Sequence, residues 1–156
     1  MSTPPDLSGM SGLEVLRWIQ EHDDDSLPSI RRLLGMRFDE VDPGRVVASL
    51  HTQLNFSNPH GTVHGGIAAT LLDSVMGCAV HTTLPPGTGY TTLELKVNYI
   101  RAAGLDGQRL IAEGTTVHVG RRTASAEGKV TDDSGALIAH GSTTCLILPP
   151  PPAPTS

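Results

Sequence analysis

Aromatic residues and positive charges are scarce in this sequence of 156 residues, and each shortage excludes a class of function. Aromatic side chains make up 3% of the chain, which is too few for a platform on which nucleic-acid bases stack. The 11 Lys and Arg residues face 16 Asp and Glu residues, so the formal net charge is -5 and no basic field attracts a phosphate backbone. Nucleic acid is therefore not expected as a partner.

Cysteines and long apolar runs are also few. Only Cys78 and Cys145 occur, both inside apolar segments, which is typical of reduced thiols in a core and not of a disulfide framework. No apolar run approaches the roughly 20 residues needed to span a bilayer, and residues 1–6 lack the basic start of a signal peptide. We therefore expect a soluble cytoplasmic protein that does not bind membranes.

Several common enzyme motifs are absent as well. The sequence has no Gly-x-Ser-x-Gly elbow, no P-loop and no Gly-x-Gly-x-x-Gly fingerprint, which argues against the corresponding hydrolases, nucleotide hydrolases and Rossmann enzymes. His60 and His64 have the spacing of a metal-binding pair, but they precede the helix and lack the Glu of His-Glu-x-x-His. No metal site is predicted.

The length suffices for a single domain with one core. We divide the chain into a helical extension at residues 1–28, a main domain at 29–148 and a disordered proline-rich tail at 149–156. The extension contains apolar residues at helical spacing between Leu13 and Gln20, and a second short helical turn is expected at residues 28–34.

The main domain alternates between strand-like runs and turn signals, with one interruption. A hairpin is predicted at residues 36–40 and 45–52 around Asp42-Pro43-Gly44, and a long apolar helix from Gly65 to about Thr82. A meander of four antiparallel strands is expected to follow at residues 90–101, 108–119, 122–132 and 136–148. The economical solution is an α+β fold in which a curved antiparallel sheet wraps around one central helix.

One carboxylate lies in the apolar helix, two turns from its start. Burying an ionised carboxylate without a partner costs several kcal/mol, so Asp73 is either functional or a surface residue that is solvated or paired with Arg. At about 100° per residue, Asp73 lies opposite the aliphatic face and shares its side with Gly66, Thr70, Met76 and Gly77. This side suits a ligand cleft.

Glycines at the helix start expose N–H groups and favour negative charge, so Gly65 and Gly66 are candidate oxyanion-hole donors.

The same residues carry a family resemblance. The elements concerned are Asn58, Gly61, His64-Gly65-Gly66 and Asp73, then residues 91–101, which read TTLELKVNYIR, and Gly120-Arg121-Arg122-Thr123. In this combination the chain, from about Ile30 to Leu148, resembles the hotdog-fold acyl-CoA thioesterases of the phenylacetic-acid-degradation type. These are related to the 4-hydroxybenzoyl-CoA thioesterases, which carry Glu where this chain has Asp73 and Thr where it has Gly77.

The resemblance implies a site, a substrate and an assembly. The implied function is hydrolysis of an acyl- or aryl-acyl-CoA to a free acid and coenzyme A. No cofactor is implied beyond the coenzyme A of the substrate. The implied assembly is a homodimer with shared active sites, or a homotetramer built as a dimer of dimers. The implied catalytic residues are Asp73, Gly65, Gly66, Asn58 and His64. Residues expected to contact the acyl group are Thr70, Met76, Gly77, Tyr90, Thr91 and Thr92, and those expected to contact coenzyme A are Arg101, Gly120, Arg121, Arg122 and Thr123.

Several alternatives remain open on the sequence. Asp73 is either a nucleophile that forms an anhydride with the acyl group or a general base that activates water. Residues 90–92 either line the acyl pocket or only suit a strand, and Arg121 and Arg122 either bind the nucleotide or occupy a solvated turn. The rival functions are a non-catalytic acyl-CoA-binding module and an enoyl-CoA hydratase or dehydratase on the same fold, since Asn58-Pro59-His60 is similar to part of that family's signature.

Overall fold

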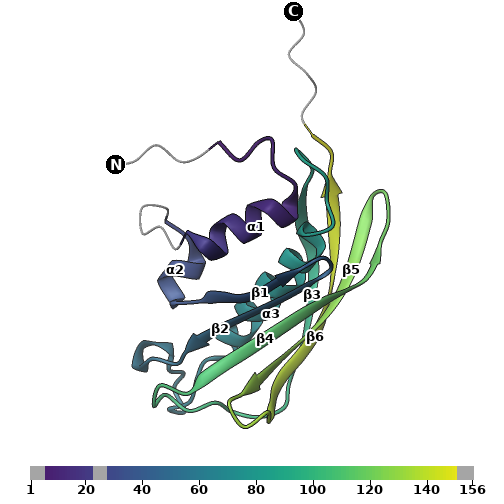
Figure 1. Ribbon diagram of the computed structural model, residues 1–156. Coiled ribbons are helices and arrows are strands. Elements are labelled where there is room, and N and C mark those ends of the chain that lie inside the picture. The colour runs from purple at the N-terminus through teal and green to yellow at the C-terminus, as the bar shows by residue number, and fades with distance from the viewer. Residues whose placement is uncertain (1–5, 23–27, 151–156) are drawn as a thin grey trace, which may run out of the picture.

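The computed structural model describes residues 6–22 and 28–150, and its main feature is a six-stranded antiparallel sheet curved around one long helix (Figure 1). The predicted α+β fold is thus confirmed, and element boundaries agree with the expected ones to within a few residues. The helices are α1 (Gly12–Glu21), α2 (Ile30–Leu34), the short 3-10 helix η1 (Leu54–Phe56) and α3 (Gly65–His81). The strands are β1 (Arg37–Asp42), β2 (Arg45–His51), β3 (Gly89–Tyr99), β4 (Arg109–Val119), β5 (Thr123–Asp132) and β6 (Leu137–Leu148).

The order of strands in the sheet differs from the predicted meander at one position. The order is β1-β2-β4-β5-β6-β3, so β4, β5 and β6 form a meander, but β3 pairs with β6 and forms the far edge. The prediction of four consecutive strands side by side was therefore wrong for β3. Alternation in a sequence indicates a strand and its buried face but does not encode the neighbour, and consecutive strands are adjacent only about two-thirds of the time.

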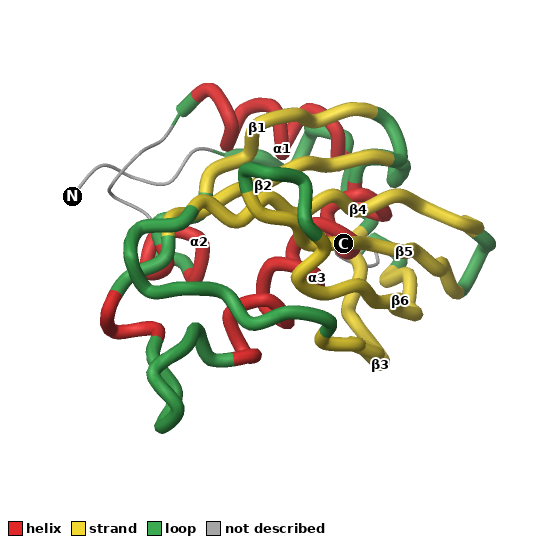
Figure 2. The backbone as a smooth tube through the Cα atoms, turned by 90° about the horizontal axis from the view of Figure 1, so that it is seen from below, coloured by secondary structure: helices red, strands yellow, loops and turns green. Residues whose placement is uncertain are grey.

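Helix α3 forms the centre of the core. Seen from below, it runs through the space that the strands enclose (Figure 2). Fully buried aliphatic side chains point from it in several directions, because the sheet curves around it: they are Leu71, Leu72, Val75, Met76 and Val80. The helix therefore has no single apolar stripe. Met76, which the helical phasing placed on the side of Asp73, is completely buried, and so is Val80.

A row of three glycines crosses the sheet beneath α3. Gly114 of β4 pairs with Gly128 of β5, and Gly128 pairs in turn with Gly141 of β6. A Cβ at Gly114 would lie 2.5 Å from the backbone carbonyl of Val75, and one at Gly128 would lie 2.9 Å from Met76 Cγ. Real Cβ contacts are not this short, so the absence of a side chain at Gly114 lets the α3 backbone approach β4 directly, and its absence at Gly128 makes room for Met76 and Leu72. A Cβ at Gly141 would instead meet the Lys96 carbonyl of β3. We call this set, Gly114, Gly128 and Gly141, the glycine row.

Helix α1 closes one end of the molecule. Ser11 and Glu14 form a capping box at its start, since the Ser11 hydroxyl accepts from Glu14 N–H and the Glu14 carboxylate accepts from Ser11 N–H. Gly12 N–H donates to the Leu84 carbonyl, and a Cβ at Gly12 would overlap the backbone carbonyl of His81. The start of α1 thus packs directly on the C-terminal end of α3.

Parts of the predicted extension and of the predicted tail lie outside the described residues. They are residues 1–5 and 23–27 of the extension and residues 151–156 of the tail. Among the helices of the described ranges, none combines the length and the apolar character needed to cross a bilayer.

Candidate active site

The loop before α3 is organised by Asn58. Its side-chain carbonyl accepts from the N–H groups of His60 at 2.9 Å and Thr62 at 3.2 Å, and its amide nitrogen donates to Thr62 Oγ1 at 3.0 Å. The Asn58 backbone also binds Thr62 and Gly61. Gly61 has a φ of 77°, which favours glycine. Asn58 therefore holds the loop in shape, and one of its two amide hydrogens remains available for a ligand.

His64 caps α3 and determines which backbone donors are free. Its Nδ1 accepts from Gly66 N–H at 2.9 Å and so caps the first turn of the helix. Gly66 is thus engaged by the cap. Gly65 N–H has no partner within the described part of the chain, which makes Gly65 the first free donor at the helix start.

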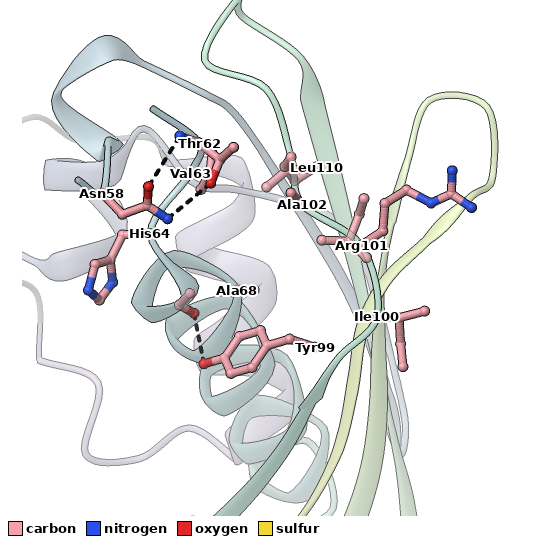
Figure 3. Close-up of a pocket in the computed structure, with 13 residues that line it drawn as sticks. Asn58, Thr62, Val63, His64, Ala68, Tyr99, Ile100, Arg101, Ala102 and Leu110 are labelled. Atoms are coloured by element: carbon pink, nitrogen blue, oxygen red, sulfur yellow. Dashed lines mark hydrogen bonds between the residues drawn. The ribbon is translucent and has the colours of Figure 1, made fainter. Parts of the chain in front are cut away.

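A pocket opens beside this helix start (Figure 3). Its volume is about 300 Å³, and its walls combine the Asn58–His64 loop and Gly65 with residues 99–103. Tyr99 points toward α3 and donates from its hydroxyl to the Gly65 carbonyl at 3.1 Å. Leu110 and Ile138 form its apolar floor. Sequence reasoning did not assign Tyr99 to the site. The signals were its place at the end of the alternating run of β3 and within residues 91–101, which carry part of the family resemblance.

Asp73 lies at a different position, two turns further along α3. It is half-buried, and its Oδ1 accepts a hydrogen bond of 2.8 Å from Thr92 Oγ1 of β3. Among the described residues, Asp73 forms no ion pair with Arg or Lys. The alternative that Asp73 is a surface carboxylate paired with Arg therefore does not apply. Thr92 holds one carboxylate oxygen, and the other has no protein donor among the described residues.

An apolar wall continues from Asp73 toward the end of α3. Tyr90, two residues before Thr92, lies against Gly77, where a Cβ would come within 2.7 Å of the tyrosine ring. Its hydroxyl contacts the Cys78 thiol, and burial raises the pKa of that thiol to about 12. Burial also raises the pKa of Tyr90. Both groups are therefore neutral at physiological pH, and the wall carries no charge.

The loop and the carboxylate do not meet within one chain. Gly65 and Asp73 are eight residues apart on one helix, and at 1.5 Å per residue their backbones are separated by about 12 Å. Each is matched by a different end of β3, because Tyr99 contacts Gly65 and Thr92 contacts Asp73. The pocket at the helix start does not include Asp73. A thioester carbonyl bound at Gly65 is therefore out of reach of Asp73 in the same chain.

The residues expected to contact coenzyme A are divided in the same way. Arg101 N–H donates to the Ile138 carbonyl, whereas the Arg122 carbonyl accepts from Ile147. Nine residues of β6 separate these two contacts, a distance of about 30 Å. Arg101 is exposed and extends away from α3 (Figure 3).

The Gly120–Thr123 turn lies at the other end of the sheet from Arg101. Gly120 N–H donates to the Thr123 carbonyl within this turn. Arg121 and Arg122 are exposed there and line a second hollow together with Thr88 and residues 146–150.

The remaining predicted residues lie in three environments. Met76 is completely buried against Gly128 of the glycine row, so it belongs to the core and presents no exposed surface to an acyl group in this chain. Thr70 donates to the Gly66 carbonyl within α3. Thr91 is exposed, because its neighbours Tyr90 and Thr92 face the helix and strand side chains alternate. Within residues 6–22 and 28–150, no three His, Cys, Asp or Glu side chains are grouped to hold a metal ion.

Comparison with known proteins defines the class. Residues 60–139 match the sequence profile of the thioesterase superfamily. Human acyl-coenzyme A thioesterase 13 is 28% identical over 115 residues, which cover 72% of this chain and 81% of that protein. The 1,4-dihydroxy-2-naphthoyl-CoA hydrolase of Listeria monocytogenes is 24% identical over 111 residues, or 70% of this chain and 87% of the hydrolase.

Solved structures agree with this match. A variant of the phenylacetic acid degradation protein PaaI from Thermus thermophilus has a TM-score of 0.68 and 29% identity, covering 74% of this chain and 96% of that one. The sheet wrapped around α3 is the hotdog fold. The chain belongs to the thioesterase superfamily, with PaaI-type thioesterases among its structural neighbours, and its class of activity is thioester hydrolysis.

Proposed function

We propose that this protein is an acyl-CoA thioesterase that hydrolyses an acyl- or aryl-acyl-CoA to the free acid and coenzyme A. The observation that carries the proposal is Asp73, a half-buried carboxylate held by Thr92. It lies on the helix whose first N–H, at Gly65, has no partner among the described residues. Relatives named as an acyl-coenzyme A thioesterase and as a naphthoyl-CoA hydrolase support a coenzyme A thioester as the substrate.

The proposed chemistry divides the work between these two groups. Gly65 N–H and the helix dipole stabilise the oxyanion that develops on the thioester carbonyl. Asp73 either attacks that carbonyl, forming an anhydride that water then opens, or removes a proton from a water molecule that attacks directly. In both routes the carbon–sulfur bond breaks, the thiolate of coenzyme A leaves with little acid assistance, and one water molecule is consumed per turnover.

A single turnover in ¹⁸O-labelled water separates the two routes. If Asp73 is the nucleophile and water opens the anhydride at the Asp73 carbonyl carbon, the original Asp73 oxygen enters the first molecule of acid and the label appears in the protein carboxylate. Label in the protein therefore identifies the nucleophilic route, whereas a general base, or opening of the anhydride at its acyl carbon, places the label in the acid alone.

Replacing Asp73 tests the assignment itself. We expect Asp73→Asn and Asp73→Ala to lose hydrolysis across a panel of acyl-CoA thioesters followed by thiol release, with Asp133→Asn, in an exposed turn, as the matched control. Unchanged hydrolysis in both variants would refute the role of Asp73. Binding of acyl-CoA without turnover by the wild-type protein would identify a binding module, and hydration of an enoyl-CoA without thiol release would identify a hydratase.

We further propose that two copies share the active sites. The edge strand β3 has 11 residues, and no other strand of residues 6–22 and 28–150 pairs with its outer side. Its Leu93 is 55% exposed, which suits pairing with another strand. Antiparallel pairing of β3 with its copy about a two-fold axis brings the Thr92 end of one strand toward the Tyr99 end of the other. Asp73 of one protomer then approaches the Gly65 donor of its partner.

The same arrangement would explain why Arg101 and the Arg121–Arg122 pair lie at opposite ends of the sheet in one chain. The Arg121–Arg122 turn lies near the start of β3, since Thr88 lines the same hollow, and Arg101 follows its end. Antiparallel pairing therefore places the paired arginines of one protomer and Arg101 of its partner at the same edge, where coenzyme A phosphates are expected to bind. Light scattering tests the assembly: we expect a dimer or a larger even oligomer, and an active monodisperse monomer would refute the proposal.

A further inference from the structure

The face of α3 that carries Asp73 ends at an aromatic side chain. Asp73, Gly77 and His81 follow one another at intervals of four residues and so lie on one side of the helix. Tyr90 covers the middle of this row, since its ring lies against Gly77 and 5.5 Å from the His81 ring, centroid to centroid. The tyrosine therefore stands directly beyond the carboxylate, along the seam between α3 and β3.

The space that Tyr90 fills exists because Gly77 has no side chain. A Cβ at Gly77 would lie 2.7 Å from both Cε2 and the hydroxyl oxygen of Tyr90, which is shorter than side-chain carbons approach other atoms. The ring is fixed from three further sides. Its hydroxyl contacts Cys78, its face is tilted against His81, and β3 pairs at this position with Ile147 of β6.

His81 is itself held in place by α1. A Cβ at Gly12 would come within 2.6 Å of His81 Cδ2, so the start of α1 packs against the imidazole. The contacts run from Gly12 through His81 to Tyr90. Helix α1 thus supports the wall beyond Asp73. The Tyr90 ring is therefore less free to change its conformation than an isolated surface side chain.

We propose that Tyr90 ends the acyl site beyond Asp73 and sets the upper limit on the size of the acyl group. This inference rests on the proposed thioesterase function and names the size class of the substrate: a compact acyl group that stops at the Tyr90 ring. The seam suits the acyl group because Gly77, Cys78 and Tyr90 carry no charge, whereas the arginines expected to bind coenzyme A lie at the surface. Tyr90 is a specificity-determining residue here and takes no part in bond breaking.

Shortening Tyr90 tests this limit. Tyr90→Leu removes the ring and opens the slot above Gly77. Each methylene group that then enters raises kcat/KM about fourfold, the equivalent of ~0.8 kcal/mol at about 1.4 kcal/mol per factor of ten. We expect the ratio of kcat/KM for a thioester two methylene groups beyond the wild-type optimum, relative to the optimum, to rise about 15-fold.

Two matched variants separate a size limit from general damage. Tyr90→Phe keeps the ring and loses only the hydroxyl, so the substrate ratio should stay at the wild-type value. Adding Gly77→Ala to Tyr90→Leu places a methyl group in the vacated slot and should move the ratio back toward the wild type. Tyr90→Met, whose flexible side chain fits irregular cores, takes the place of Tyr90→Leu if the latter does not fold.

The outcomes distinguish this inference from the function on which it rests. Straight-chain acyl-CoAs from butyryl to decanoyl are compared for each variant by thiol release. Hydrolysis by the wild type with an unchanged ratio in Tyr90→Leu or Tyr90→Met overturns the role of Tyr90 alone. An equal shift in Tyr90→Phe also overturns it, because the ring would then not be the limit. No hydrolysis by the wild type of any thioester, aryl-acyl-CoAs included, overturns the proposed function and this inference together.

Discussion

Replacing Gly65 by proline deletes the proposed oxyanion donor with little change to the helix. Gly65 is the first residue of α3, a position at which proline is favoured because its missing N–H has no intrahelical partner. His64 has φ of -60° and ψ of 134°, the extended conformation that a residue before proline prefers. The His64 cap on Gly66 is left in place. Few substitutions remove one backbone donor this selectively.

The expected loss follows from the number of donors at the helix start. Gly66 N–H is already bound by His64 Nδ1, which leaves the Gly65 N–H as the free group. Removing one oxyanion-hole donor typically lowers kcat by about 10²–10³-fold, or about 2.7–4 kcal/mol. We expect a loss in this range for Gly65→Pro, with a smaller change in KM, because the contact strengthens as charge develops in the transition state.

Gly65→Ala is the matched control. It adds the same Cβ, which would lie 2.9 Å from the Tyr99 ring, but keeps the N–H group. The Tyr99 ring is at the exposed end of its strand and can move, so activity should fall only modestly. Steady-state kinetics by thiol release and thermal unfolding are measured for both variants. Equal losses in the two would refute the donor role and indicate that crowding against Tyr99 is responsible.

The same variant examines whether sites are shared between copies. A Gly65→Pro protomer retains Asp73, and an Asp73→Asn protomer retains the Gly65 donor. If the two groups come from different chains, a mixed dimer has one intact site of its two. An equal mixture of the inactive proteins, allowed to exchange subunits, should then recover about a quarter of the wild-type activity. No recovery after demonstrated exchange would mean that each site belongs to a single chain.

Three further changes are expected to have measurable effects. Thr92→Val removes the hydrogen bond to Asp73 and should lower kcat about tenfold or more, whereas Thr92→Ser should retain most of it, as steady-state kinetics will show. Gly114→Ala should cost about 1–3 kcal/mol in urea unfolding and exceed Gly128→Ala, because its Cβ meets the α3 backbone instead of the flexible Met76; equal costs would contradict this. Burial lowers the pKa of His81 from its usual 6.5, so the folded state binds fewer protons than the unfolded state, and stability should be constant above about pH 7.5 and decrease as pH falls through 6.5. His81→Gln should lose that part of the pH dependence in denaturant midpoints, and the exposed His140→Gln should keep it.

Local patterns in the sequence predicted the elements well because the signals are local. The apolar run after Gly65-Gly66, the turn at Asp42-Pro43-Gly44 and the alternation of residues 90–101 each fix backbone geometry within a few positions. The neighbour of β3 depends instead on which edge of the sheet remains open after β2, β4, β5 and β6 have paired. No residue within β3 encodes that choice.

The candidate site was predictable in composition but not in arrangement. Asp73 and the Gly65–Gly66 start were recognised from one continuous segment. The hydrogen bond from Thr92 and the contact of Tyr99 with Gly65 join positions 19 and 34 residues apart, and a single sequence gives no signal for such pairs. Met76 was misplaced for a related reason: when a sheet surrounds a helix, the side of the helix opposite the aliphatics is also core.

The glycine row has a consequence for motion. Because Gly114 lets the backbone of α3 rest directly on β4, no flexible side chain lies between the two backbones at that point to absorb a slide or a rotation. Gly65 and Asp73 also lie on one continuous helix, so the spacing between them should stay constant throughout a catalytic cycle. Substrate entry and product release must be accommodated by the two elements outside this contact, the Asn58–His64 loop and the edge strand β3. Their backbone amides should exchange with solvent faster than those of α3. Helix α3 would then hold the reacting groups at a fixed spacing while the loop and β3 move to admit substrate and release product.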